Sequence, residues 1–100
     1  MAVDIPEVAE VRNLLRELDE EGLISRLESF LLLNEGLESK RGEDFIKVSI
    51  LGFLEGLLTS LKMKYPEDNE VRNLLERVSA KRREVDELFR EPKLRNLSGE

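Results

Sequence analysis

The chain has 100 residues, of which 40% are hydrophobic and 38% are charged, and its net charge is −6 at pH 7. It contains no cysteine, histidine or tryptophan, which excludes disulfides, thiolate nucleophiles, imidazole bases and the usual protein ligands of zinc. The length is that of a single domain, and we expect no cofactor and no bound transition metal.

The N-terminal segment lacks the basic stretch followed by an apolar stretch that marks a secretory signal, so we expect a cytoplasmic protein. The most apolar window, residues 45–61, is interrupted by Lys47 and Glu55. A membrane-spanning helix needs about 20 residues with few or no charges, so we interpret this window as a buried helix and expect no membrane association. The high content of charged residues is typical of proteins from hyperthermophiles.

A first helix is predicted to begin near Pro6, because Asp4 and Glu7 have the spacing of a capping box and proline suits the first turn. Apolar residues then recur at spacings of three and four, as on the buried face of an amphipathic helix: Val8, Val11, Leu14, Leu15 and Leu18. Gly22 is predicted to end this helix.

A second helix continues the same apolar period from Leu23. The sequence is compatible with two positions for the end of this helix. Lys40 and Arg41 before Gly42 favour a late end, because basic residues stabilise the last turn of a helix. Asn34 and the glycine at position 36 favour an end about a turn earlier, because glycine weakens a helix interior by about 1 kcal/mol.

A third helix is predicted from Glu43 to about Lys64, and its apolar arc is so broad that we expect it to be the central element. Small residues line up beside this arc at spacings of three and four: Ser49, Gly52, Gly56 and Ser60. Missing side chains allow another helix to approach closely. That helix belongs either to the same chain or to a second copy, and the sequence leaves both alternatives open.

A fourth helix is predicted from Pro66 to Pro92. Three valines occupy the a positions of successive heptads, as in a short coiled coil: Val71, Val78 and Val85. Residues 93–100 are polar, and we interpret them as a tail that follows a single helical domain formed by residues 1–92.

The predicted fold class is all-α. Short connections between four helices favour antiparallel neighbours, so we expect an up-down-up-down four-helix bundle. No segment shows the alternating pattern of a strand.

Residues 6–15 and 66–75 are identical at eight of ten positions. Nothing like the second or third helix follows residue 78, so we interpret the similarity as a shared way of starting a helix rather than as a duplication. Within the helix, Asp68 and Glu76 lie four residues from Arg72, a favourable spacing for ion pairs, whereas no acid lies at that spacing from Arg12.

Basic residues gather around Lys81, Arg82 and Arg83, a feature of nucleic-acid-binding proteins. Acidic residues are interleaved with them, and no aromatic platform accompanies them. We therefore expect a salt-bridged helix surface and no nucleic-acid binding.

The segment Leu15–Asp19 resembles the opening of helical chorismate mutases, enzymes that hold a dianionic substrate with arginine and lysine side chains from several helices. The resemblance implies that Arg16 would bind substrate. The sequence departs from that pattern at Asn34 and Glu35, where another arginine is expected, and Arg26 and Lys47 are the remaining candidates for that role.

Residues 21–38 and 48–58 resemble short acidic proteins of unknown function from the Thermococcus and Pyrococcus group. This resemblance covers most of the chain and implies no activity and no site residues.

These features favour a non-enzymatic helical module for protein–protein interaction that associates with itself as a homodimer. The candidate interface is the small-residue face of Ser49, Gly52, Gly56 and Ser60, or the valine stripe of Val71, Val78 and Val85. The alternative is a small helical enzyme or ligand-binding bundle that acts on an anionic metabolite. A convergent basic pocket would favour the alternative, and an exposed apolar patch would favour association.

Overall fold

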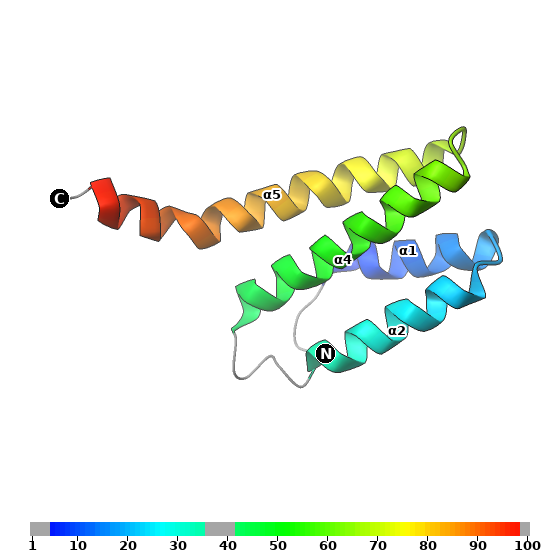
Figure 1. Cartoon of the computed structure of the whole chain (residues 1–100), viewed down its shortest axis with the longest axis horizontal. Helices are drawn as coiled ribbons and strands as arrows, with labels where there is room; N and C mark the ends of the chain where they lie inside the picture. The colour runs from blue at the N-terminus through cyan, green and yellow to red at the C-terminus, as the bar shows by residue number, and fades with distance from the viewer. Residues whose placement is uncertain (1–4, 36–41, 99–100) are drawn as a thin grey trace.

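The computed structural model describes residues 5–35 and 42–98, with side chains as far as Glu87. Every regular element in these residues is a helix. The helices are α1 (Pro6–Glu17), α2 (Glu21–Glu35), α4 (Glu43–Lys64) and α5 (Asn69–Ser98) (Figure 1). The described part of the chain contains no strand, which confirms the predicted all-α class.

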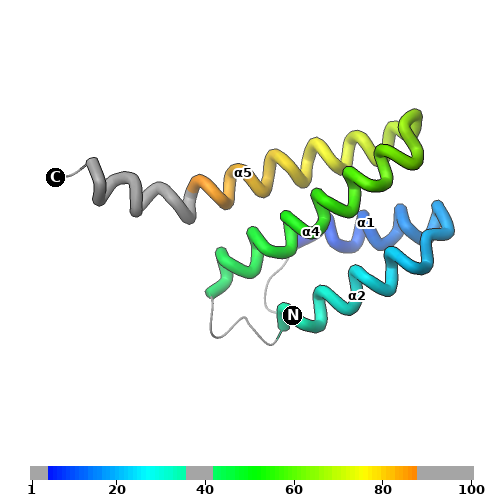
Figure 2. Tube along the Cα trace, viewed as in Figure 1, coloured from blue at the N-terminus to red at the C-terminus, as the bar shows by residue number. Residues whose placement is uncertain are grey.

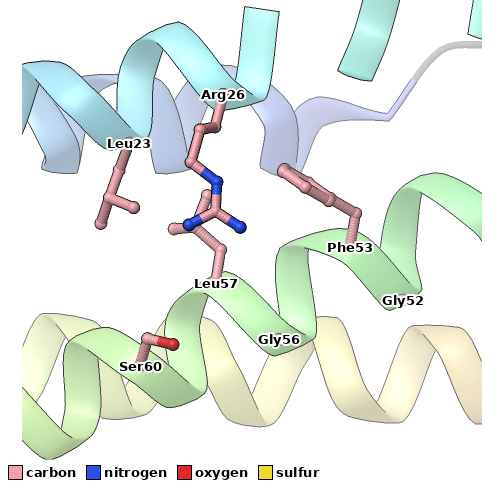
Figure 3. A pocket seen from close by; sticks show the side chains of 7 residues that line it. All are labelled: Leu23, Arg26, Gly52, Phe53, Gly56, Leu57 and Ser60. Atoms are coloured by element: carbon pink, nitrogen blue, oxygen red, sulfur yellow. The ribbon is translucent and has the colours of Figure 1, made fainter. Parts of the chain in front are cut away.

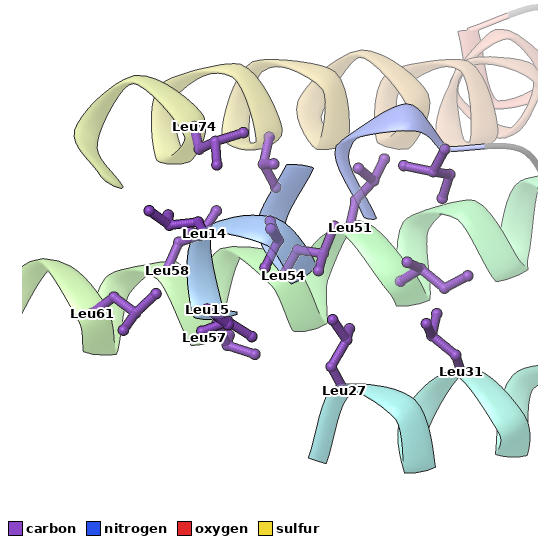
Figure 4. Close-up of a cluster of buried hydrophobic side chains, with 14 of the residues drawn as sticks. Leu14, Leu15, Leu27, Leu31, Leu51, Leu54, Leu57, Leu58, Leu61 and Leu74 are labelled. Carbon is purple, nitrogen blue, oxygen red and sulfur yellow. The ribbon is translucent and has the colours of Figure 1, made fainter. Parts of the chain in front are cut away.

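The third predicted helix, α4, lies at the centre of the fold. It packs against α5 and α2, and α1 in turn contacts α2 and α5 (Figure 2). Its broad apolar arc is buried, with Ile46, Ile50, Leu51, Leu54 and Leu58 completely inaccessible to solvent. Leucines from the other three helices close around it (Figure 4). Burial of each such side chain stabilises the fold by about 1.5–3 kcal/mol, so this cluster is the main source of stability.

The first helix ends earlier than predicted. α1 stops at Glu17, and Asp19 adopts a left-handed backbone conformation with φ of 59°. The N–H of Glu20 donates to the carbonyl of Leu15 at 2.9 Å, and the N–H of Asp19 donates to that of Arg16 at 3.1 Å, which is the hydrogen-bond pattern of a Schellman motif. The prediction that Gly22 ends the helix is therefore wrong, because aspartate takes the position that usually requires glycine and Gly22 lies inside α2.

Two predicted boundaries involve residues outside the described part. α1 begins at Pro6 as expected, but its N-cap is Ile5, which offers no side-chain cap, and Asp4 is not among the described residues. α2 is helical to Glu35. The later end considered for this helix falls in residues 36–41, which also lie outside the described part.

The fourth helix begins at Asn69 rather than at Pro66, because the carboxylate of Asp68 accepts a hydrogen bond from the backbone N–H of Val71 at 3.1 Å. The residue that corresponds to Asp68 in the repeated segment is Val8, which cannot form this cap. The helix also passes Pro92 and continues to Ser98. A proline removes one intrahelical hydrogen bond, but it does not oblige the chain to leave the helical conformation.

The turn between α1 and α2 is joined to the end of α4 by Glu20. One oxygen of its carboxylate accepts hydrogen bonds from Lys64 Nζ at 2.6 Å and from the Tyr65 hydroxyl at 2.5 Å. The bond from Lys64, followed by the bond from Tyr65, lowers the pKa of Glu20. The same carboxylate raises the pKa of Tyr65, because it stabilises the protonated hydroxyl. These contacts hold the two turns at one end of the fold together.

Ion pairs join the acidic first helix to the basic part of α5. Glu10 accepts two hydrogen bonds from Arg77, at 2.6 and 3.1 Å, and Glu7 pairs with Lys81 at 2.9 Å. Because these pairs are partly solvated, each adds little to stability, and their main effect is to fix how α1 lies along α5. They also neutralise two of the cations that form the basic segment of α5.

None of the described helices combines the length and the apolar character that crossing a membrane requires.

Candidate interaction surface

The valine stripe of α5 is not an exposed surface. Val71 and Val78 are fully buried in the core, and Val85 is half-buried and packs against it. The heptad-like spacing of these residues therefore reflects packing of α5 within the chain. The exposed part of the candidate interface lies on α4.

The small residues of α4 border a groove of about 320 Å³ between α2 and α4. Gly52, Gly56 and Ser60 line it from α4, together with Phe53 and Leu57 of the same helix, and α2 contributes Leu23 and Arg26 (Figure 3). Ser49, the fourth predicted member, is half-buried and does not line this groove. The two α2 residues were not predicted as part of this surface, because their place in it depends on how α2 packs against α4.

The two glycines have different surroundings. A Cβ atom at Gly52 would lie 3.9 Å from Cδ of Arg82 on α5, which is ordinary van der Waals contact. A Cβ atom at Gly56 would meet no described atom within 4 Å. A side chain of α5 thus covers Gly52, whereas Gly56 has no cover from the described part of the chain.

Glu55 holds Arg82 in this position. Its carboxylate accepts a hydrogen bond from Nε of Arg82 at 2.6 Å and another from the hydroxyl of Ser79 at 2.6 Å. The bond from Ser79 is the largest cause of the lowered pKa of Glu55. With its charge paired with that of Glu55, Arg82 places its aliphatic part against Gly52.

The solvent-facing side of α2 extends the apolar surface. A second groove of about 320 Å³ is lined by Ser25, Arg26, Ser29, Phe30, Leu33 and Phe53. The rings of Phe30 and Phe53 stack with their centroids 4.2 Å apart and an angle of 8° between their planes. Beyond them, Leu32 and Leu33 are 69% and 71% exposed. Contiguous exposed apolar surface is a feature of interaction sites.

A third hollow, of about 360 Å³, lies on the other side of α2. Its lining residues are Glu21, Ile24, Ser25, Glu28 and Ser29. Ser25 and Ser29 therefore line both hollows and form a low crest between them.

Arg26 lies where the first two grooves meet, and its guanidinium group points over the groove toward α4 (Figure 3). Within the described part of the chain it makes no ion pair or side-chain hydrogen bond. Its exposed charge is therefore available to a molecule that occupies the grooves.

Among the described residues, the cations that a substrate site would need do not line one hollow. Arg16 donates to the side chain of Asn13 at 3.3 Å on the exposed surface, and Lys47 pairs with Glu43 at 3.8 Å. Arg26 is the one basic residue among those that line the three hollows. In the described residues no group of three or more acidic side chains is arranged to hold a metal ion.

Arg12 and Arg72, which occupy equivalent positions in the repeated segment, have other partners than helical spacing predicts. Arg12 is paired with Glu28 on α2 through two hydrogen bonds, at 2.7 and 3.1 Å. Arg72 donates to Asn69 at 3.0 Å. Arg12 therefore links α1 to α2, and its partner lies too far along the sequence to be found by helical spacing.

Comparison with known proteins gives the relationships of the chain. The family model described as protein of unknown function (DUF3216) matches residues 8–99. Among solved structures, the chain is similar to one described as the crystal structure of a singleton protein, PF1176, from P. furiosus. The two are 45% identical over 82% of this chain and 89% of that chain, with a TM-score of 0.76. No curated protein matches.

These relationships confirm the resemblance to uncharacterised archaeal proteins. The chain belongs to the family of proteins of unknown function DUF3216.

Proposed function

We propose that this protein is a non-enzymatic helical interaction module that associates with itself through the surface formed by α2 and α4. We call this surface the α2–α4 face. It consists of the two adjacent grooves and of the exposed side of α2, which separates these grooves from the third hollow. The observation that carries the proposal is the pair of leucines, Leu32 and Leu33, that remain about 70% exposed beside these grooves.

The α4 part of the face supports the same proposal. Gly56 and Ser60 are exposed, and glycine weakens a helix by about 1 kcal/mol relative to alanine. No described atom lies within 4 Å of a Cβ placed at Gly56, so packing within the described part of the chain does not account for the small residue there. Close approach by a partner supplies a reason for it.

The alternative, action on an anionic metabolite, needs several cations directed at one cavity. Arg26 is the one basic residue among those that line the grooves, while Arg16 contacts Asn13 and Lys47 contacts Glu43. These observations favour association over a ligand-binding enzyme.

The proposed module has the antiparallel up-down-up-down order. Two tight turns support this order, one between α1 and α2 and one between α4 and α5 (Figure 1). In this arrangement, α2 and α4 present their grooves on one side of the bundle.

Sedimentation velocity of the purified full chain over a range of concentrations tests the proposal. We expect a dimer that dissociates on dilution. Replacement Gly56→Leu should shift the equilibrium toward monomer, because the larger side chain fills the groove without touching the described core. The matched control is Ala80→Leu, which adds a similar side chain at an exposed position of α5 and should leave the dimer intact.

Two results would count against the proposal. One is an unmodified chain that sediments as a monomer at the highest concentrations reached. The other is a Gly56→Leu protein that keeps its helical circular dichroism spectrum and dimerises as well as the Ala80→Leu control.

A further inference from the structure

On the exposed side of α2, large apolar residues lie at one end and the small residues lie toward the other. Leu32 and Leu33 lie near its C-terminal end, whereas Gly22, Ser25 and Ser29 are exposed toward its N-terminal end. Successive residues of a helix are rotated by about 100°. The two leucines therefore lie on opposite sides of the crest that Ser25 and Ser29 form, with Leu33 on the side of the groove that contains Phe53.

We infer that α2 packs against α2 of a second copy in an antiparallel pair whose two-fold axis passes beside Ser29. This inference rests on the proposed self-association and names the contact that produces it. The two-fold axis lies in the interface and runs perpendicular to the helices. It therefore reverses the direction of α2, but a residue on one side of the crest in the first copy lies on that same side in the second. Leu33 of the second copy then enters the groove lined by Arg26, Phe30 and Phe53, level with Ser25.

Leu32 of the second copy falls on the other side of the crest, over the hollow lined by Ile24, Ser25 and Glu28. Leu33 thus meets a groove of about 320 Å³ between α2 and Phe53 of α4, and Leu32 meets an open depression on the surface of α2, both beside small residues. A parallel pair would instead place leucine against leucine and serine against serine. That arrangement leaves the hollows empty and loses van der Waals contacts.

Charge complementarity points to the same partner. The last turn of α2 contains no basic residue, although cations stabilise this end of a helix. In the antiparallel pair, residues whose numbers add up to 58 are level with each other along the two helices. Arg26 of one copy is therefore level with the first residue of the last turn of the other. Arg26 makes no ion pair within the described chain and is free to interact with the carbonyl end of the second α2.

The size of the contact indicates that α4 contributes as well. A stable interface buries about 800 Å² on each partner. The exposed side of a 15-residue helix is about 22 Å long and about 10 Å wide, which falls well short of that area. The rim of the α4 groove, with Phe53, Gly56 and Ser60, lies beside α2 and supplies further area.

The chain contains no cysteine, so single cysteines can report which residues of the two copies meet. A Ser29→Cys protein should form a disulfide-linked dimer under mild oxidation, because residue 29 faces itself across the axis. In a Ser25→Cys protein, the cysteine of one copy is level with residue 33 of the other. The two cysteines are therefore eight residues, or about 12 Å, apart along the helices. That distance exceeds the Cα separation of about 7 Å that a disulfide tolerates, so a Ser25→Cys protein should not cross-link with itself.

A mixture of the Ser25→Cys and Leu33→Cys proteins should cross-link as a heterodimer, since these positions face each other. An Ala80→Cys protein is the matched control and should remain uncross-linked. Replacement Arg26→Gln should weaken the dimer by about 3- to 30-fold, because the favourable interaction with a helix end is lost twice. Replacement of the exposed Arg72 by glutamine should leave it unchanged.

The outcomes separate the inference from the proposed function. If the unmodified chain is a monomer, both are overturned. If it is a dimer but Ser25→Cys cross-links with itself as readily as Ser29→Cys, or Ser29→Cys does not cross-link, the antiparallel contact is overturned while self-association stands.

Discussion

Replacement of Asn34 by leucine should stabilise the protein. Asn34 is 3% exposed, and its Nδ2 donates to the carbonyl of Phe30 at 2.9 Å, but its Oδ1 has no hydrogen-bond partner among the described residues. An unsatisfied buried acceptor costs about 1–3 kcal/mol, whereas a typical hydrogen bond contributes about 0.5–1.5 kcal/mol. Leucine removes both effects and adds buried apolar surface, so the free energy of unfolding should rise by about 1–2 kcal/mol.

Differential scanning calorimetry measures this effect as a change in Tm. One kcal/mol corresponds to about 4–8 °C for a domain of this size, so the Asn34→Leu protein should melt about 4–16 °C higher. The matched control is Leu27→Asn, which makes the reverse change at a fully buried position of the same helix and should lower stability by about 2 kcal/mol or more. A fall in the Tm of Asn34→Leu would refute the reasoning and show that Oδ1 is satisfied in solution, for example by a buried water.

Three further predictions concern the fold. Asp19→Gly should raise the free energy of unfolding, measured with denaturant, by about 1 kcal/mol, because a φ of 59° costs glycine less than it costs aspartate; an unchanged or lower value would contradict this. Leu58→Ala should lower it by about 2–5 kcal/mol, since this side chain is completely buried; a loss below 1 kcal/mol would argue against the described core. Glu20 has a lowered pKa in the folded state, so its stabilising contribution is present above the ordinary value of 4.5 and is lost as the pH falls through its folded value. Stability should therefore decline less steeply in acid for Glu20→Gln than for the unmodified chain, and identical pH profiles would contradict the assignment.

The central helix was predicted correctly because its signals are local. Two acids at its start, a long apolar arc and a proline soon after its end define α4 at Glu43–Lys64 without reference to the rest of the chain. The end of α1 was missed because a left-handed residue was expected to be glycine, whereas Asp19 takes that conformation. The start of α5 was placed too early, because the prediction relied on Pro66 and overlooked Asp68 as a cap.

The candidate surface was predicted only in part, for a different reason. The spacing of Gly52, Gly56 and Ser60 along one helix is visible in the sequence. The groove that they line also needs Leu23 and Arg26, which are placed by the packing of α2 on α4. In the same way, the burial of Val71 and Val78 depends on tertiary contacts, since a heptad pattern is compatible with a partner in the same chain or in another.

The ion pairs between α1 and α5 have a consequence for synthesis of the chain. Glu10 and Arg77 are 67 residues apart in sequence, and Glu7 and Lys81 are 74 apart. During translation the first helix therefore leaves the ribosome long before its basic partners exist. Until α5 is made, the acidic side chains of α1 face water and its leucines have only α2 and then α4 to pack against. Closing so long a loop adds an entropic barrier, so α1 should dock fully only after most of the chain has emerged.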